Sequence, residues 1–234
     1  TILSGDLNGD DIPDDPEANR TDNANNVVYI QNVSEQSIID GFTISNGHSD
    51  EPQASVFSDS RGGGLISESP IRLRNCRFTQ NYAGRSGGGL YFFYSGETEV
   101  QLESCIIESN FSEDEGGGAT FFNTRNFSLD SCTFRLNEAG SNGGGLAFTG
   151  ISAALIADCT FDENVAAESG GGMFAEDGDD FSLVGSTFQN NDCVVHGAGA
   201  FVEDMNLSVS SCNFIDNAGI VGGGGGLTWF TADS

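Results

Sequence analysis

The sequence predicts an all-β fold, a single-stranded right-handed parallel β-helix in which each coil of the solenoid takes about 27 residues. Three observations predict it. Glycine clusters recur at an almost constant interval, a Phe-x-x-Asn motif recurs between them at the same interval, and apolar and polar residues alternate around both. Self-similarity at a period of roughly 20 to 50 residues is typical of stacked repeats. One continuous solenoid is therefore expected.

The glycine clusters give the clearest measure of the period. Successive final glycines are 25, 29, 27, 27, 27 and 27 residues apart. Glycine reaches positive φ at no steric cost and lets two backbones approach closely, so we expect a corner of the coil at each cluster. The seven final glycines are Gly64, Gly89, Gly118, Gly145, Gly172, Gly199 and Gly226.

The alternation of apolar residues predicts short strands. Pairs such as Phe127/Leu129 precede the Phe-x-x-Asn motif, and pairs such as Leu146/Phe148 follow the glycines. Period-2 alternation indicates strands with one buried face, and no stripe with a 3.6-residue period indicates a helix. We expect two or three strands in each coil. About eight coils at the usual strand spacing would make a rod on the order of 40 Å long.

Three columns of residues repeat with the coils. The cysteine column and the Phe/Ile column two residues later are expected to fill the interior, the cysteines as reduced thiols because parallel Cβ vectors make disulfides awkward. The asparagine column is expected at a turn, where Asn tolerates the left-handed conformation and stacked amides bond from coil to coil. The cysteine column is Cys76, Cys105, Cys132, Cys159, Ser186 and Cys212; the asparagine column is Asn81, Asn110, Asn137, Asn164, Asn191 and Asn217.

The paired motifs Phe-x-x-Asn and Gly-Gly-[Gly/Ala]-Leu resemble the repeat of the chlamydial polymorphic membrane proteins, whose signatures are FxxN and GGA[ILV]. They are also similar to those of the wider set of bacterial right-handed parallel β-helix repeat proteins. The resemblance covers about residues 27–230. It implies a parallel β-helix and a surface-exposed adhesin segment.

The composition excludes some partners. The chain has 234 residues and a net charge of −27, and all eight of its basic residues are arginines. Such a chain repels nucleic acid and anionic membrane. No apolar run approaches the roughly 18 residues needed to span a bilayer, so we expect no membrane insertion by this segment. The acidity is typical either of a soluble or salt-adapted surface or of multivalent cation binding.

The two ends of the chain carry the apolar pattern of interior coils. Residues 1–3 and 227–230 read as strands without a polar cap. We therefore expect either a piece of a longer extracellular or cell-surface protein, or copies that associate head to tail.

The sequence divides into residues 1–26, a first strand and an acidic loop, and residues 27–234, the repeats as one continuous domain. Oxygen ligands at loop positions 1, 3, 5, 9 and 12 are typical of a calcium loop. Glycine is missing at position 6, where Asp11 stands. The alternative is an acidic surface insertion between coils. The predicted Ca²⁺ ligands are Asp6, Asn8, Asp10, the carbonyl of Ile12, Asp14 and Glu17.

Aromatic residues recur at positions predicted to face outward after the glycines. Exposed aromatics on one face are typical of a glycan or protein receptor site. The alternative is that a flanking loop or a neighbouring chain covers them. The residues are Tyr91, Phe93, Phe122, Phe174, Phe201 and Phe230.

Two functions fit these observations. The first is a non-catalytic, extracellular β-helix segment of a bacterial cell-surface protein, acting as a stalk, adhesin or assembly module. The alternative is a calcium-dependent polysaccharide lyase or glycoside hydrolase of β-helix fold. Many carboxylate pairs could serve a hydrolase, but none is distinguished by its position, and the chain has no lysine to act as a lyase base. The sequence thus nominates no catalytic residue.

Overall fold

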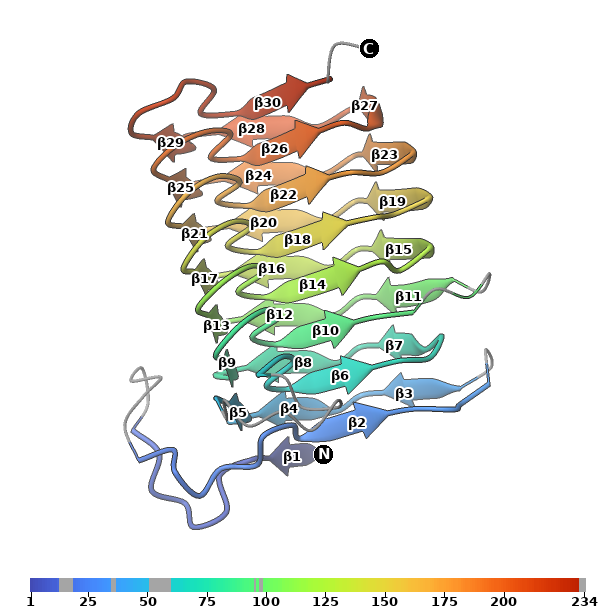
Figure 1. Cartoon of the computed structure of the whole chain (residues 1–234), viewed down its shortest axis with the longest axis vertical. Helices are drawn as coiled ribbons and strands as arrows, with labels where there is room; N and C mark the ends of the chain where they lie inside the picture. Colours follow the sequence, from blue (N-terminus) through green and yellow to red (C-terminus); the bar gives the residue numbers. More distant parts are fainter. Residues whose placement is uncertain (13–18, 35–36, 51–59, 95, 97–98, 232–234) are drawn as a thin grey trace.

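The computed structural model describes residues 1–12, 19–34, 37–50, 60–94, 96 and 99–231. The described chain winds as a rod of stacked coils with the N-terminus at one end and the C-terminus at the other (Figure 1). Every strand pairing is parallel, and each strand pairs with its equivalent one coil away. The predicted parallel β-helix is therefore confirmed.

Each regular coil contains four strands rather than the two or three expected, and they form four sheets, which we name A to D. The fourth strand is only two residues long, too short for alternation to reveal it. In chain order a coil visits sheets B, C, A and D.

Sheet A consists of β1 (Ile2–Ser4), β4 (Thr43–Ser45), β8 (Arg77–Thr79), β12 (Ile106–Glu108), β16 (Thr133–Arg135), β20 (Thr160–Asp162), β24 (Thr187–Gln189) and β28 (Asn213–Ile215). Sheet B consists of β2 (Val28–Ile30), β6 (Leu65–Ser67), β10 (Leu90–Phe92), β14 (Ala119–Phe122), β18 (Leu146–Thr149), β22 (Met173–Glu176), β26 (Ala200–Glu203) and β30 (Leu227–Phe230).

Sheet C consists of β3 (Ile38–Asp40), β7 (Arg72–Arg74), β11 (Val100–Glu103), β15 (Asn126–Asp130), β19 (Ala153–Ala157), β23 (Asp180–Val184) and β27 (Asn206–Ser210). Sheet D consists of β5 (His48–Ser49), β9 (Tyr82–Ala83), β13 (Phe111–Ser112), β17 (Glu138–Ala139), β21 (Val165–Ala166), β25 (Asp192–Cys193) and β29 (Ala218–Gly219).

The interior is built from columns of like residues, as the repeat predicts. In sheet A the rings of Phe134, Phe161 and Phe188 stack, with centroids 4.9 and 4.5 Å apart, and all three are fully buried. Stacked aromatic pairs contribute about 0.5–1.5 kcal/mol beyond the area that they bury. One large hydrophobic core therefore runs along the rod, with a small separate cluster of Ala166, Cys193 and Ala198 among the described residues.

The cysteine column is a ladder of free thiols. Cys76, Cys105, Cys132 and Cys159 are buried, and no disulfide links them. The neighbouring Cys132 thiol, together with burial, raises the pKa of the Cys105 thiol to about 12, so it stays protonated at neutral pH. The Cys159 backbone N–H donates to the Ser186 hydroxyl at 3.1 Å, just as the Cys132 N–H donates to Cys159 Sγ at 3.4 Å, so serine makes the same contact as cysteine in this column.

The asparagine column bonds adjacent coils, as expected. The backbone N–H and the side-chain amide of Asn137 both donate to Oδ1 of Asn164, at 3.1 and 3.0 Å. The expected left-handed conformation, however, lies one residue earlier, at positions such as Leu136 and Asn190. The prediction of a left-handed backbone at the asparagines is therefore wrong. Asparagine recurs in this column because its side chain bonds adjacent coils. In the coil of β2 to β5 the equivalent position is Gly47, whose N–H donates to Asn81 Oδ1 at 3.0 Å.

Leu136 is the least suited residue at that corner, since its φ is +55° and its side chain is 49% exposed. A left-handed backbone costs an ordinary L-residue about 1–2 kcal/mol, and Asn tolerates it better. We expect Leu136→Asn to raise the free energy of unfolding by about 1 kcal/mol in urea titrations. Leu155→Asn, an exposed leucine within β19, is the control and should give no gain. Equal stability of Leu136→Asn and wild type would contradict the strain.

Candidate functional site

The acidic loop follows β1 at the corner between sheets A and D, before β2 begins the first complete coil. Gly5 donates its N–H to Ser45 O at 2.8 Å as the chain leaves β1, and Ala24 accepts from the His48 N–H at 2.9 Å as it returns. The described part of the loop, residues 6–12 and 19–23, lies between these two bonds. The loop is therefore an insertion at this corner of the rod.

Three carboxylates of this loop converge. Oxygen atoms of Asp6, Asp10 and Asp22 lie within 4.8 Å of one another, and among the described residues these form the one cluster with metal-ligand spacing. Two members, Asp6 and Asp10, are predicted ligands. Asp22 lies outside the twelve-residue spacing, and only its acidic character could have indicated it.

The other predicted ligands have different outcomes. Asn8 Oδ1 accepts the Asp10 backbone N–H at 3.0 Å, which shapes the loop. Ile12 lies in the same loop with its side chain exposed. Asp14 and Glu17 lie outside the described residues.

The electrostatics of the cluster favour charged carboxylates. Slight desolvation raises the pKa of Asp6, but the backbone N–H groups of Gly9 and Asp11 donate to its carboxylate and hold the pKa below its ordinary value. Asp22 Oδ2 is shielded from solvent and has no hydrogen-bond donor among the described residues. A shielded oxygen without a donor beside two carboxylates is the chemistry that a hard cation such as Ca²⁺ satisfies.

The contacts of Asp11 explain why this loop has an acid at the position where a calcium loop has glycine. Its carboxylate turns toward the rod, where it accepts from Nδ2 of Asn46 at 2.6 Å and pairs with the buried Arg20 guanidinium at 3.5 Å. Arg20 also donates to Gln80 O at 2.9 Å. This anchor fastens the loop to the next coils, and it requires an acid where a calcium loop has glycine.

The outward aromatics divide into two groups. Tyr91, Phe174 and Phe201 are buried, so their predicted exposure is wrong. Neighbouring groups cover them: the Phe174 and Phe201 rings stack at 5.3 Å, and the Arg61 guanidinium lies 5.2 Å from the centre of the Tyr91 ring. Phe93, Phe122 and Phe230 are exposed as predicted.

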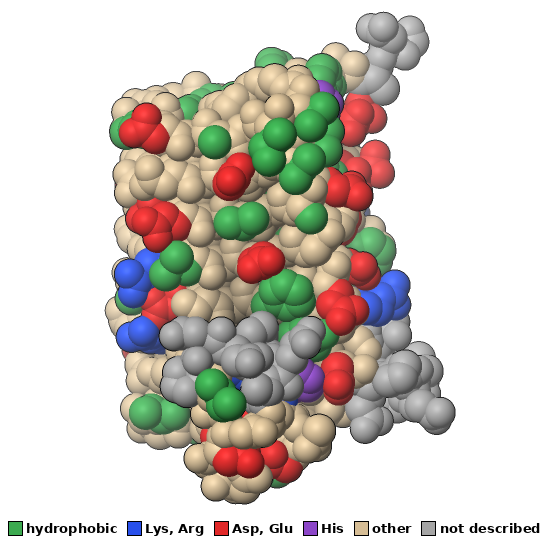
Figure 2. Space-filling model, turned by 90° about the vertical axis from the view of Figure 1, so that its left-hand side faces the viewer, with side chains coloured by type: hydrophobic (Ala, Val, Ile, Leu, Met, Phe, Trp, Pro, Cys, Tyr) green, Lys and Arg blue, Asp and Glu red, His purple; other side chains and the backbone are tan. Residues whose placement is uncertain are grey.

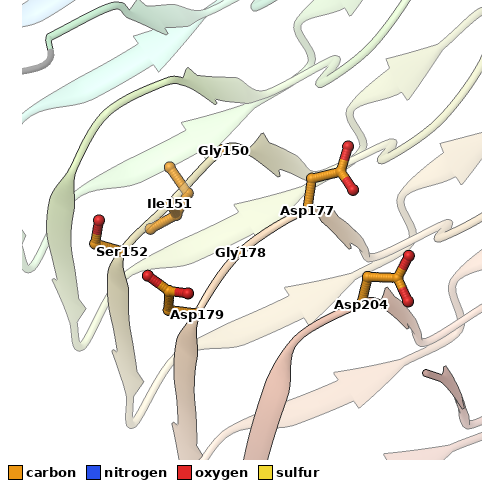
Figure 3. Close-up of a pocket in the computed structure, with 7 residues that line it drawn as sticks. All are labelled: Gly150, Ile151, Ser152, Asp177, Gly178, Asp179 and Asp204. Atoms are coloured by element: carbon orange, nitrogen blue, oxygen red, sulfur yellow. The ribbon is translucent and has the colours of Figure 1, made fainter. Parts of the chain in front are cut away.

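A second acidic group occupies the turns after sheet B. A hollow of about 360 Å³ is lined by Asp177, Asp179 and Asp204 together with Ile151 and Ser152. Figure 3 shows the Asp177 and Asp204 carboxylates pointing the same way, while that of Asp179 points toward Ser152. The three do not converge on one point, in keeping with a solvated acidic turn.

The surface charge is uneven along the rod. The last arginine is Arg135, so beyond it, with His counted as neutral, aspartate and glutamate are the only side chains with a formal charge. On the face shown in Figure 2, basic side chains lie in the N-terminal half, while acidic side chains extend to the C-terminal end. In the described part of the chain no helix is long and apolar enough to cross a membrane.

Comparison with known proteins agrees with this geometry. The family model described as "Right handed beta helix region" matches residues 69–233, more than half of the chain. No curated protein and no solved structure matches the chain significantly. With the parallel coils, the repeating corners and this match together, the chain belongs to the family of right-handed β-helix regions.

Proposed function

We propose that the chain is a non-catalytic β-helix module of a bacterial cell-surface protein, serving as a stalk, adhesin or assembly segment. The observation that supports this proposal is that the buried polar side chains bond one coil to the next. The asparagines bond coil to coil, and the buried Glu108 carboxylate is bracketed by Arg77 and by Arg135, the latter at 2.5 Å. Groups bound in this way hold the rod together.

The test is prolonged incubation with acidic and neutral polysaccharides, with and without Ca²⁺, followed by chromatography of the products. The module should release no oligosaccharides. Depolymerisation that increases with the concentration of this protein would contradict the proposal.

The alternative is a calcium-dependent polysaccharide lyase or glycoside hydrolase. The observation in its favour is Glu115, whose pKa is raised by burial although an Asn142 side chain donates to it. A carboxyl group with a raised pKa can act as a general acid. If cleavage is found, Glu115→Gln should abolish it.

We further propose that Asp6, Asp10 and Asp22 bind Ca²⁺ and thereby stabilise the folded protein. A ligand that binds only the folded state stabilises it by about 2.7 kcal/mol at 100 times its Kd. Millimolar Ca²⁺ should therefore raise the melting temperature relative to excess chelator. Asp10→Asn with Asp22→Asn should remove the increase, and Asp179→Asn, which alters an acid outside the cluster, should not. Identical melting of the wild type in Ca²⁺ and in chelator would contradict the site.

We also propose head-to-tail association of this chain. Val209 and Trp229 in the last coil are 40% and 49% exposed, although their partners one coil earlier, Leu183 and Val202, are fully buried. In β1 at the opposite end, Leu3 is 36% exposed, although its partner one coil later, Ile44, is fully buried. Salt screens the repulsion between acidic copies, so sedimentation velocity should show end-to-end oligomers as ionic strength rises. A monomer at every salt concentration would contradict this proposal.

A further inference from the structure

Two exposed phenylalanines, Phe93 and Phe122, lie side by side on the surface near sheet B, and we call this apolar pair the Phe93–Phe122 step. Phe93 follows β10 and Phe122 ends β14, on adjacent coils. Their ring centres are 6.0 Å apart, with 27° between the planes, and the side chains are 46% and 38% exposed. Paired exposed aromatic rings are typical of binding surfaces.

A hollow of about 420 Å³ adjoins Phe122. It is lined by Arg61, Arg85, Asp114, Glu115 and Thr120 in addition to that ring. The Arg85 Nε and Asp114 Oδ2 atoms are 3.8 Å apart, a loose ion pair. Two guanidinium groups and two carboxylates give the hollow no net formal charge.

A second hollow of about 500 Å³ adjoins Phe93 and is also lined by Asn123, Arg125 and Ser152. Its backbone is held in place because the Arg125 N–H donates to Tyr94 O at 3.2 Å and Arg125 O accepts from Ser152 N–H at 2.9 Å. The hollow thus offers an amide, a guanidinium and a hydroxyl group beside an exposed ring.

We propose that the Phe93–Phe122 step and the two hollows bind a neutral oligosaccharide. A sugar ring presents an apolar C–H face that can lie on an aromatic ring and adjacent hydroxyls that carboxylate and guanidinium groups bind in pairs. Each hollow lies in the range of about 300–1,000 Å³ typical of small-ligand sites.

The charges favour a neutral ligand over an acidic one. The first hollow has balanced charges and the second is lined by the single Arg125 guanidinium, but the chain as a whole carries −27, which repels a polyanion at low salt. The polar lining disfavours an apolar peptide, because guanidinium and carboxylate groups would lose water without gaining partners. This inference goes beyond the proposed function but rests on it in one respect, that the sugar is bound without being cleaved.

The test is calorimetric titration with cellohexaose, mannohexaose and N-acetylchitohexaose as neutral probes and with hexagalacturonate as the acidic one. At least one neutral probe should bind, with the same affinity in 20 and 500 mM NaCl. Phe93→Ala with Phe122→Ala should weaken that binding at least tenfold. Phe230→Ala, which truncates an exposed ring of the same column on β30, should leave it unchanged. Circular dichroism confirms that each variant is folded.

Three results would overturn the site: no neutral probe bound at millimolar concentration, equal binding by the double variant and the wild type, or binding of hexagalacturonate alone. Chromatography of the same mixtures separates this inference from the proposed function. Shortened sugars would contradict the non-catalytic role while leaving the binding site in place.

Discussion

Asn137→Ala is expected to lower the free energy of unfolding by about 3 kcal/mol in urea or guanidinium titrations. Oδ1 of Asn137 accepts both the backbone N–H and the side-chain amide of Asn110, and Nδ2 donates to Ile107 O at 2.9 Å. The alanine variant leaves the buried Asn110 N–H without this acceptor. A buried unsatisfied group costs about 1–3 kcal/mol, and the other lost bonds and the small cavity add to it.

The matched control is Asn217→Ala in the last described coil. Asn217 makes the same bonds, to Asn191 and to Phe188 O. Its side chain is only half-buried, so water can replace the lost partners. We expect a loss of no more than about 1 kcal/mol. Equal losses at positions 137 and 217 would contradict the role of burial.

Gly172→Ala is expected to destabilise the protein by about 3 kcal/mol or more, or to prevent folding. A Cβ atom at this position would lie 2.4 Å from Gly199 O on the next coil and 3.0 Å from the Phe188 ring. Backbone cannot move away there without breaking the ladders on either side. The clash arises at the final glycine of the cluster, and this column contains glycine in all seven clusters.

Gly219→Ala provides the control. A Cβ atom there would meet only Cys193 Sγ, at 3.8 Å, and the residue is not in the left-handed region. The two variants should be compared by thermal melting and by soluble yield. Similar melting temperatures for Gly172→Ala and wild type would show that the coils do not depend on glycine for their close approach.

The fold was predictable because each contact of a stacked repeat recurs in several coils, so the residues that make it recur in the sequence at a fixed interval. The columns through Phe161 and Asn164 recur every 27 residues in this region, and identical spacing places identical side chains above one another. The two-residue strands of sheet D were not predictable, since a pair such as Val165–Ala166 carries no periodicity. The left-handed corner was assigned to the wrong residue because Leu136 and Glu163 give no conformational signal there.

The candidate sites were less predictable than the fold. Asp6 and Asp10 were found by their spacing, but Asp22 joins them only because the loop folds back on itself. Asp11 resembles a ligand in sequence, yet its contacts are with Arg20 and Asn46. The burial of Tyr91 depends on Arg61, which belongs to a different coil. In the part of the chain that the structure describes, each of these contacts occurs once, so no repeat reveals it.

The recurring polar side chains stabilise the rod by bonding one coil to the next. A double-mutant cycle on Asn137 and Asn164 tests it most directly, with unfolding free energies measured for both single alanine variants and for the pair. We expect the double variant to lose less than the sum of the single losses, with a coupling of about 1–2 kcal/mol, because the two amides share a hydrogen bond. The pair Asn110 and Asn191, which are not in contact, should be additive. Additivity within about 0.3 kcal/mol at Asn137 and Asn164 would contradict the claim.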